Sequence, residues 1–338
     1  MAHARFIVRS VGPLVTIQDR GRHGFLRYGV PESGPMDRDA FEIAHAALGY
    51  CASRAAIEVS LGGIDLECVE GSVTLAVAGG GFAIALDKMA LSSWAVVNVG
   101  AGSRVTIRPG SWGSWTYVAF AGRLKVDAWL GSYSTHASSG FGGGRITTGQ
   151  SLAIEDAKLN EERVREIDCP AWIRPRTQFD VVFGPQDRYF SEKRCELLVS
   201  ESFALTDAFD RMGVRLSGPR LEPDATLDMP SQPIAFGSIQ VSGDGVPTVL
   251  LADHQTTGGY PKIATVVSDQ VGGLVQHRSR SLISFRRVEP EAAIQELRER
   301  REHVATFLAS LRAKPTTLLH RLMSVNLIDG VTSGAPEA

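Results

Sequence analysis

Cysteine is scarce in this sequence, and its placement argues against two kinds of scaffold. The 338 residues include 4 cysteines, and no two of them form a C-x-x-C pair. A zinc knuckle or a disulfide framework needs such spacing or a higher density of cysteine. The N-terminus also lacks the apolar core and small-residue cleavage site of a signal peptide. We therefore expect a cytoplasmic protein with reduced thiols.

Long apolar runs and strongly charged clusters are absent as well. No apolar run reaches the roughly 18 residues that a membrane-spanning helix needs. The 35 Lys and Arg residues nearly balance the 37 Asp and Glu residues, and the net charge is −2. Nucleic-acid binding depends on clustered cations that release counterions from phosphates. We expect no membrane and no nucleic acid among the partners.

Several common catalytic motifs are missing too. No H-E-x-x-H pair and no Gly-x-Ser-x-Gly elbow occurs, so neither a zinc protease nor a serine hydrolase is indicated. The glycines at 79–81 precede a strand-like run at 82–86, whereas a dinucleotide fingerprint needs a helix there. We predict no metal site.

The sequence does contain many short β-branched runs, punctuated by 35 glycines and 16 prolines. This pattern is typical of antiparallel barrels or sandwiches rather than of βαβ repeats. The clearest runs cover residues 73–78, 95–99, 104–107, 115–120 and 180–183. The predicted fold class is mainly β, with a few short helices and a C-terminal helix.

Two segments have helical periodicity. Residues 37–48 begin with Asp37, a suitable N-cap, and end before Gly49. Residues 289–313 begin next to Pro290 and stop before Pro315. The apolar stripe expected on this longer helix consists of Ile294, Leu297, Val304, Leu308 and Leu311.

A charged, proline-bearing segment at 157–176 marks the predicted domain boundary. We divide the chain into a first β-barrel region (1–168), a second one (169–288), the helix at 289–313 and a mobile tail at 314–338.

The densest group of polar residues lies between two strand-like runs, in residues 249–267. A plain hairpin connection needs only two to five residues. This one is longer and contains Asp253, Gln255, Thr256, Thr257, Gly258, Gly259, Tyr260 and Lys262. We interpret it as the wall of a pocket for a small planar substrate with a carbonyl or carboxylate group.

Each residue type in this stretch suggests a role. Lys262 is a compact cation, Asp253 is a candidate base that could also orient Lys262, and Gln255 is a neutral donor. Thr256 and Thr257 add donors, Gly258 and Gly259 let backbone N–H groups approach a ligand, and Tyr260 fixes the loop. We predict catalytic roles for Asp253, Lys262 and Gln255, and place Gln240 in the same site.

Two further places carry open alternatives. In the glycine-rich stretch at 16–41, Gln18, Asp19 and Ser33 either bind small polar groups or belong to a covering loop. Near Asp210, the side chain of Arg211 either holds a substrate carboxylate or phosphate, or forms an ion pair that fixes a loop.

With these residues identified, the sequence resembles the biotin-dependent carboxyltransferase family, also called allophanate hydrolase subunit 2, which includes the C-type component of 5-oxoprolinase. The resemblance runs from about Val8 to Val288. The motifs that carry it begin at Gln18, Gly29, Glu58, Gly131, Gly184, Asp210, Gly237 and Gln255.

The resemblance implies two cyclophilin-like β-barrels and the catalytic subunit of an ATP-dependent complex that opens 5-oxoproline to glutamate. It also implies two partners, a smaller protein of related fold (the B-type component of 5-oxoprolinase) and a third protein (the A-type component), with ATP used at the level of the complex.

Two alternatives follow from the same resemblance. One is a carboxyltransferase that moves a carboxyl group from biotin to urea or a related amide. The other is a regulatory partner of a smaller, kinase-inhibitor-like protein. Tyr133 and His254 stand where relatives usually carry arginine, which bears on the choice of substrate.

Overall fold

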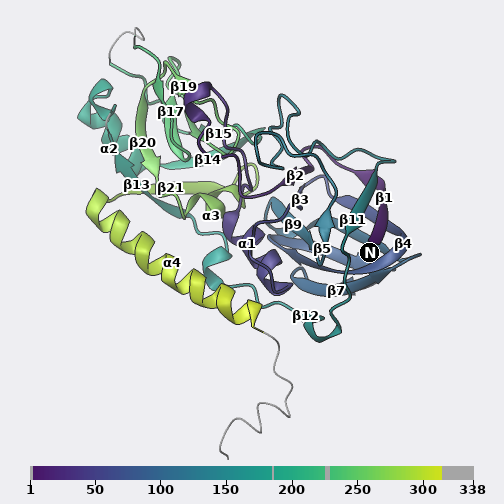
Figure 1. Ribbon diagram of the computed structural model, residues 1–338. Helices are drawn as coiled ribbons and strands as arrows, with labels where there is room; N and C mark the ends of the chain where they lie inside the picture. The colour runs from purple at the N-terminus through teal and green to yellow at the C-terminus, as the bar shows by residue number, and fades with distance from the viewer. Residues whose placement is uncertain (1–2, 185, 225–228, 314–338) are drawn as a thin grey trace, which may run out of the picture.

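A computed structural model of the chain describes residues 3–184, 186–224 and 229–313. Within these residues two groups of β-strands lie side by side, and one long helix runs along both (Figure 1). The prediction of a mainly β chain with barrel-type units, short helices and a C-terminal helix is confirmed. The tail predicted at 314–338 lies outside the described residues.

The first β unit is a 12-stranded sheet built around its longest strand, β4 (Ile64–Ala78). One half of β4 pairs with β1 and β8, and the other half pairs with β7 and β9, so the sheet folds over a shared core. The other strands are β1 (His3–Val11), β2 (Thr16–Gln18), β3 (Ala56–Ser60), β5 (Gly81–Leu86), β6 (Met89–Leu91), β7 (Ala95–Gly100), β8 (Arg104–Trp112), β9 (Trp115–Phe120), β10 (Arg123–Leu124), β11 (Ser151–Glu155) and β12 (Arg165–Glu166).

Side-chain alternation explains how these strands enclose the core. In β1, Ala4, Phe6 and Val8 are fully buried, while the residues between them are exposed or half-buried. A strand places successive side chains on opposite faces, so this alternation turns one face of β1 inward. The inner strand β3 has a buried residue at all 5 positions, including the acidic Glu58.

The second β unit is a closed barrel with the strand order β13-β20-β17-β18-β15-β14-β21. Closure removes free strand edges, and the interior is filled by apolar side chains such as Phe179, Phe203 and Phe285. The strands are β13 (Gln178–Phe183), β14 (Ser202–Phe209), β15 (Gly213–Ser217), β17 (Ser238–Val241), β18 (Pro247–Leu250), β20 (Lys262–Val266) and β21 (Leu282–Arg287). Two short strands, β16 (Gln232–Pro233) and β19 (Thr257–Gly258), pair separately.

The predicted helix at 37–48 is present as α1 (Arg38–Ala47). The Asp37 side chain accepts a hydrogen bond from the Ala40 N–H at 3.1 Å, and Gly49 has a φ of +85° just beyond the C-terminus. Both predicted boundary signals are confirmed. The remaining short helices are α2 (Glu192–Ser200), α3 (Val271–Val275), η1 (Leu26–Tyr28), η2 (Glu161–Arg163), η3 (Ala171–Ile173) and η4 (Asp187–Tyr189).

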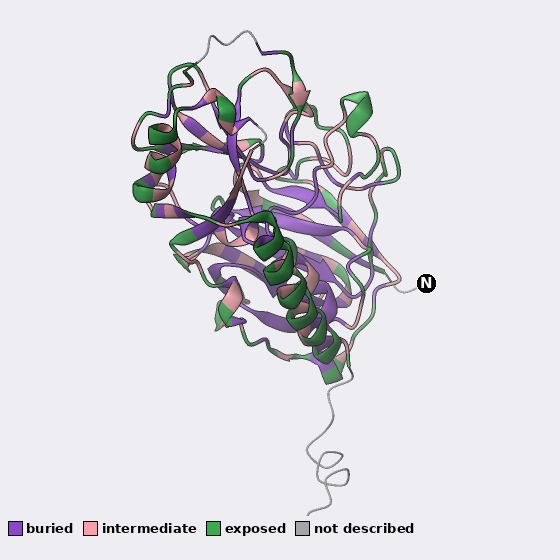
Figure 2. Cartoon of the chain, turned by 90° about the vertical axis from the view of Figure 1, so that its left-hand side faces the viewer, coloured by how far each residue is buried: buried purple, intermediate pink, exposed green. Residues whose placement is uncertain are grey.

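The long helix α4 (Pro290–Arg312) spans both β units, with one side buried and the other exposed (Figure 2). Leu308 and Leu311 are buried as predicted. The prediction for Ile294 is wrong, because its side chain is 48% exposed and the buried residue in that turn is Ala293. Neighbouring helix positions point about 100° apart, so the two cannot face the core together.

The segment between the units is ordered by contacts to both helices. Arg163 is buried and donates hydrogen bonds to the carbonyls of Ala47, at the end of α1, and of Leu311 and Arg312, at the end of α4. The last strand of the first unit, β12, precedes the first strand of the barrel, β13. The domain boundaries at 168/169 and 288/289 stay predictions. No helix in the described part of the chain is long and apolar enough to cross a membrane.

Candidate functional site

The polar stretch at 249–267 is a crossover rather than a hairpin. Strands β18 and β20, which flank it, do not pair with each other; both pair with β17. Within the connection, Gly258 pairs with Gln232 of β16. A side chain at Gly258 would place its Cβ 2.8 Å from the Gln240 amide nitrogen, so glycine permits the close approach of these two segments.

Three predicted site residues meet at a cavity of about 620 Å³, which we call the barrel cavity. Gln240, Gln255 and Tyr260 line it together with Met212 and Arg215. The Gln255 amide donates to the Gln240 side-chain oxygen at 3.1 Å, and the Gln240 amide donates to the Tyr260 carbonyl at 3.3 Å. The two side-chain amides are therefore held in fixed orientations.

A second cavity of about 280 Å³, the junction cavity, adjoins the first through the shared residues Met212 and Gln255. It lies where the two β units meet. Residues from both units line it: Gly29, Pro31, His136 and Ser138 from the first, and Met212, Asp253, Gln255, Thr256 and Thr257 from the second. The stretch at 253–260 thus forms one side of two connected cavities.

Arg211 does not project into either cavity. It is 1% exposed and donates from Nε and Nη2 to the two carboxylate oxygens of Asp253, each at 3.0 Å. It also donates to the Gly34 carbonyl at 2.6 Å and pairs with the Glu58 carboxylate of the first unit. Of the two roles left open by the sequence, the ion pair is the one seen, and it joins the two β units.

This pairing changes the interpretation of Asp253. Burial acts to raise the pKa of Asp253, but the charge and hydrogen bonds of Arg211 outweigh it and lower the pKa overall. Its Oδ2 also accepts from the Ala137 N–H at 2.8 Å. No ion pair joins Asp253 to Lys262 among the described residues. Asp253 therefore positions Arg211 and the 137 loop, and its predicted functions as base and as partner of Lys262 do not fit the geometry.

Lys262 is buried, with 6% of its surface exposed, next to Gln240, its cross-strand partner on β17. Its ammonium group has one hydrogen-bond contact, the Pro233 carbonyl at 3.4 Å. Burial lowers the pKa of Lys262. The ammonium group is thus kept away from bulk solvent, behind the Gln240 wall of the barrel cavity, with most of its donor capacity free.

The predicted residues of the N-terminal stretch have mainly internal contacts. The Asp19 carboxylate accepts from the N–H of Gly21 and Tyr133 and from the hydroxyls of Ser132 and Ser134. It therefore shapes the loop that follows Trp129. The Gln18 amide donates to Thr16 Oγ1 at 2.9 Å and to the Thr135 carbonyl at 3.0 Å, which also ties this stretch to the same loop.

Ser33 lies closer to the cavities. It is buried beside Asp253, whose pKa it helps to lower. The two positions that depart from the family also have clear environments. Tyr133 contacts Asp19 through its backbone, and burial lowers the pKa of His254, so neither supplies a cation at neutral pH.

Sequence reasoning missed Glu58 as a member of the site. Its carboxylate pairs with Arg211 and accepts from the Met36 N–H and the Tyr117 hydroxyl, each at 2.8 Å. An acid inside the otherwise apolar run at 56–60 was the available signal, because a buried carboxylate needs a partner. Among the described residues no group of His, Cys, Asp and Glu side chains could hold a metal ion.

Comparison with known proteins identifies the family. The family model for the carboxyltransferase domain, subdomains A and B, matches residues 28–287, so the chain belongs to this family. The chain is 34% identical to the C-type component of 5-oxoprolinase from Haemophilus influenzae over 87% of this chain and 94% of that protein. It is 31% identical to that of Escherichia coli over 86% and 93%, respectively.

More distant relatives are larger proteins. The urea amidolyase of Saccharomyces cerevisiae is 28% identical over 94% of this chain but only 18% of its own length. The solved structure of the protein TTHA0988 matches with a TM-score of 0.75 and 28% identity over 84% of this chain, which spans about half (55%) of that one. The Kluyveromyces lactis urea amidolyase shares the fold, with a TM-score of 0.81 at 24% identity over 91% of this chain and 20% of that one.

Proposed function

We propose that this chain is the catalytic C-type component of an ATP-dependent complex that opens the lactam ring of 5-oxoproline to give glutamate. The observation that carries the proposal is the 34% identity to a C-type component of 5-oxoprolinase over 94% of that protein. The cavities add chemical support, because side-chain amides and a shielded ammonium group suit a small, uncharged amide group.

The barrel cavity is the proposed substrate site. The Gln255 amide nitrogen is already bonded to Gln240, which leaves the Gln255 side-chain oxygen available to accept from a lactam N–H. Thr256 and Thr257, on the junction side, add hydroxyl donors. Lys262 is the cation closest in sequence and register to this set, and we assign it to the negative charge that develops on the lactam oxygen.

The residues that line the cavities do not fit ATP. A triphosphate is normally held by several cations or by a glycine-rich loop at a helix N-terminus. The barrel cavity has one arginine on its wall, Arg215, and the guanidinium of that residue is 3.4 Å from Asp244. We therefore assign ATP binding to the partner proteins and derive no step through it in this chain.

The partners we propose are a smaller, B-type protein and a third, A-type protein. Of the 12 large apolar side chains that are exposed in the described residues, 6 lie on segments that border the cavities. We call them the apolar rim: Leu26, Tyr28, Leu130, Phe141, Met212 and Tyr260.

Two contacts connect this rim across separate loops. Arg22 lies 4.5 Å from the ring centroid of Trp129, and Trp129 stacks on Phe141 with centroids 4.7 Å apart. Exposed apolar patches of this kind are typical of protein interfaces, so we assign the rim to the smaller partner. The 4 cysteines are free thiols, which suits the cytosolic location that we propose for the complex.

The test is an assay of the reconstituted complex. The chain is co-purified with its two partner proteins, and glutamate formation from 5-oxoproline is measured with and without ATP. We expect glutamate to appear only with all three proteins and ATP. A complex that assembles fully but forms no glutamate contradicts the proposal.

The second candidate is a carboxyltransferase acting on urea or a related amide, with biotin supplied on a carrier protein. The similarity to urea amidolyase over 94% of this chain favours it. Carboxylation of urea from a carboxylated biotin carrier, in place of glutamate formation, would establish this alternative. Tight binding of the smaller partner without turnover of any amide would instead identify the regulatory role.

A further inference from the structure

A third cavity lies on a different part of the molecule, beneath α4. Its volume is about 330 Å³, near the lower end for small-molecule sites, and it shares no lining residue with the barrel and junction cavities. Its walls come from three places: residues 36–42 at the start of α1, residues 268–272 at the start of α3, and the second half of α4. We call it the helix cavity.

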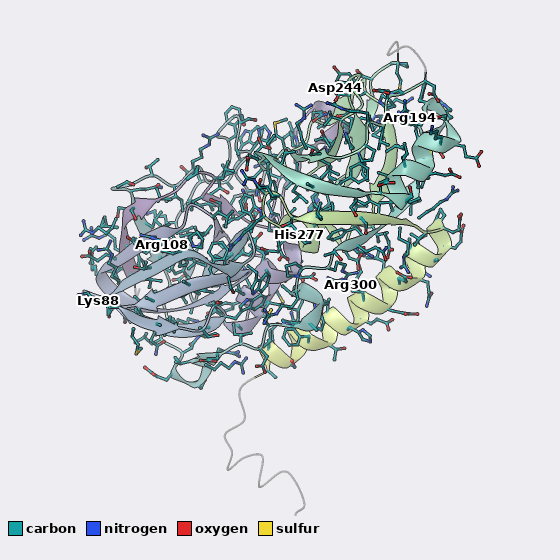
Figure 3. All side chains as sticks on the ribbon, turned by 180° about the vertical axis from the view of Figure 1, so that it is seen from behind. Lys88, Arg108, Arg194, Asp244, His277 and Arg300 are labelled. Atoms are coloured by element: carbon teal, nitrogen blue, oxygen red, sulfur yellow. The ribbon has the colours of Figure 1, made fainter. Side chains whose placement is uncertain are left out.

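One cation of this cavity is already paired. Arg300 of α4 donates from Nη2 to Asp39 at 2.7 Å and lies 2.9 Å from Asp269 through Nε. Asp39 belongs to the first β unit and Asp269 follows the last barrel strand before α3, so one guanidinium connects three parts of the chain. Arg300 extends from α4 toward the region where the two β units meet (Figure 3).

The inner end of the cavity has uncompensated negative charge. Asp37 is 2% exposed and accepts hydrogen bonds from the Ala40 N–H and the Gln276 amide, but no cation pairs with it in the described part of the chain. Burial, helped by the charge of Asp39, raises the pKa of Asp37 to about 7. Burial also raises the pKa of Asp39 and of Asp269 in spite of Arg300. A positively charged group would be favoured there.

The outer edge has the opposite character. Arg38 and Arg301 line the same cavity, are exposed, and form no ion pair within the described residues. The Arg38 guanidinium lies 5.0 Å from the ring centroid of Phe236, which also lines the cavity. Two unpaired guanidinium groups at one opening are suited to hold carboxylates, since each can donate two parallel hydrogen bonds.

The side chains between the two ends are apolar. Val304 and Leu308 of α4 face the cavity opposite Met36. A ligand that matches this order has an ammonium group at the inner end, a short aliphatic chain in the middle and carboxylates at the outer edge.

We propose that the helix cavity binds a free acidic amino acid, with its ammonium group beside Asp37 and Asp39 and its carboxylates on Arg38 and Arg301. L-glutamate has this arrangement of charges. It is also the product of the proposed reaction, and only that identity with the product rests on the proposed function. Binding would hold α4 against both β units.

Calorimetric titration of the full chain tests the proposal without any assay of turnover. We expect L-glutamate to bind, and glutarate, which lacks the ammonium group, to bind at least about tenfold more weakly. L-2-aminobutyrate, which lacks the side-chain carboxylate, should be weakened by a similar factor. L-glutamate should also raise the melting temperature, because it binds the folded state.

Two variants on the same helix locate the site. Arg301→Ala should weaken L-glutamate binding at least about tenfold. Arg298→Ala removes an exposed arginine that does not line the cavity and should leave binding unchanged. The proposal is overturned if L-glutamate does not bind at millimolar concentration, or if glutarate binds equally well. It is also overturned if binding survives Arg301→Ala but is lost in Lys262→Met, because the amino acid would then occupy the barrel cavity.

Discussion

Two buried cations of the second β unit have opposite environments. Arg211 is surrounded by acceptors, with both oxygens of Asp253, the Glu58 carboxylate and the Gly34 carbonyl in contact with it. Lys262 is nearly as buried but has a single carbonyl at 3.4 Å. A cation whose donors are all used by the protein fixes the structure, whereas a buried cation with free donors is available to a ligand.

The difference also has an energetic side. A buried ion pair is costly to break, because removal of one partner leaves an uncompensated charge in the interior. A buried lysine without a carboxylate is itself a cost to folding, and the lowered pKa of Lys262 expresses that cost. A site that places such a cation next to a cavity trades stability for the ability to bind negative charge.

The largest effect is expected for Arg211→Met. Loss of the guanidinium leaves Glu58 and Asp253 unpaired at the junction of the two units. The free energy of unfolding should fall by about 3–5 kcal/mol, measured by urea denaturation. Arg215→Met removes an exposed arginine that is 3.4 Å from Asp244 and should cost less than about 1 kcal/mol. Equal losses in the two variants would contradict the structural role of Arg211.

Lys262→Met should have the reverse profile. Turnover of the assembled complex should fall at least about 100-fold, the usual loss when a donor to a developing negative charge is removed. Stability should be unchanged or slightly higher, because a desolvated charge is removed. Lys193→Met, on the exposed side of α2, serves as the control. Full turnover in Lys262→Met would move the catalytic site elsewhere.

Asp37 extends the comparison to a buried anion that lacks a cation. Its folded-state pKa of about 7 lies above the ordinary aspartate value of 3.8, so the folded protein binds the extra proton between these values. Stability from this group is complete below about pH 4 and is lost as the pH rises through 7. Asp37→Asn should therefore reduce the loss of stability between pH 5 and pH 8 by about 2 kcal/mol.

The measurement is the free energy of unfolding at several pH values, compared with wild type and with Asp127→Asn, whose carboxyl group is exposed. The comparison uses the slope against pH, so a constant loss from a weaker N-cap does not affect it. An unchanged slope in Asp37→Asn would show that the buried carboxyl group does not titrate in this range.

The smallest effect concerns the apolar rim. Tyr28→Ser together with Phe141→Ser should weaken binding of the smaller partner by about tenfold or more, since apolar contacts at an interface core carry much of the affinity. The melting temperature of the chain alone should not change, because both side chains are exposed. Met89→Ser together with Leu282→Ser, two exposed residues outside the rim, is the matched control. Equal binding by both double variants would reject the rim as the interface.

Local patterns in the sequence were enough for most of the secondary structure. The runs at 73–78 and 180–183 became parts of β4 and β13, and the cap residue Asp37 marked the start of α1. These outcomes depend on neighbours within a few residues, such as alternation, a cap or a proline. Ile294 failed because the direction of a helix face depends on what the helix packs against.

The candidate site was predicted in part. The stretch at 253–260 does line cavities, because so many polar residues in one connection are seldom needed for structure alone. The partner of Arg211 was not predictable, since Glu58 lies 153 positions away in the sequence. The free donors of Lys262 were equally hidden, because they depend on which acceptors the fold brings near.

The sequence by itself determined the strands, the ends of the helices, the family and the location of the polar connection, all of which follow from residue types at short spacing. Only the tertiary structure decided that Arg211 joins the two β units, that Lys262 stays unpaired behind Gln240, and that Asp37 shares a cavity with two unpaired arginines. The physical reason is that charge pairing acts through space between segments that are distant in the chain, and burial strengthens it by removing water.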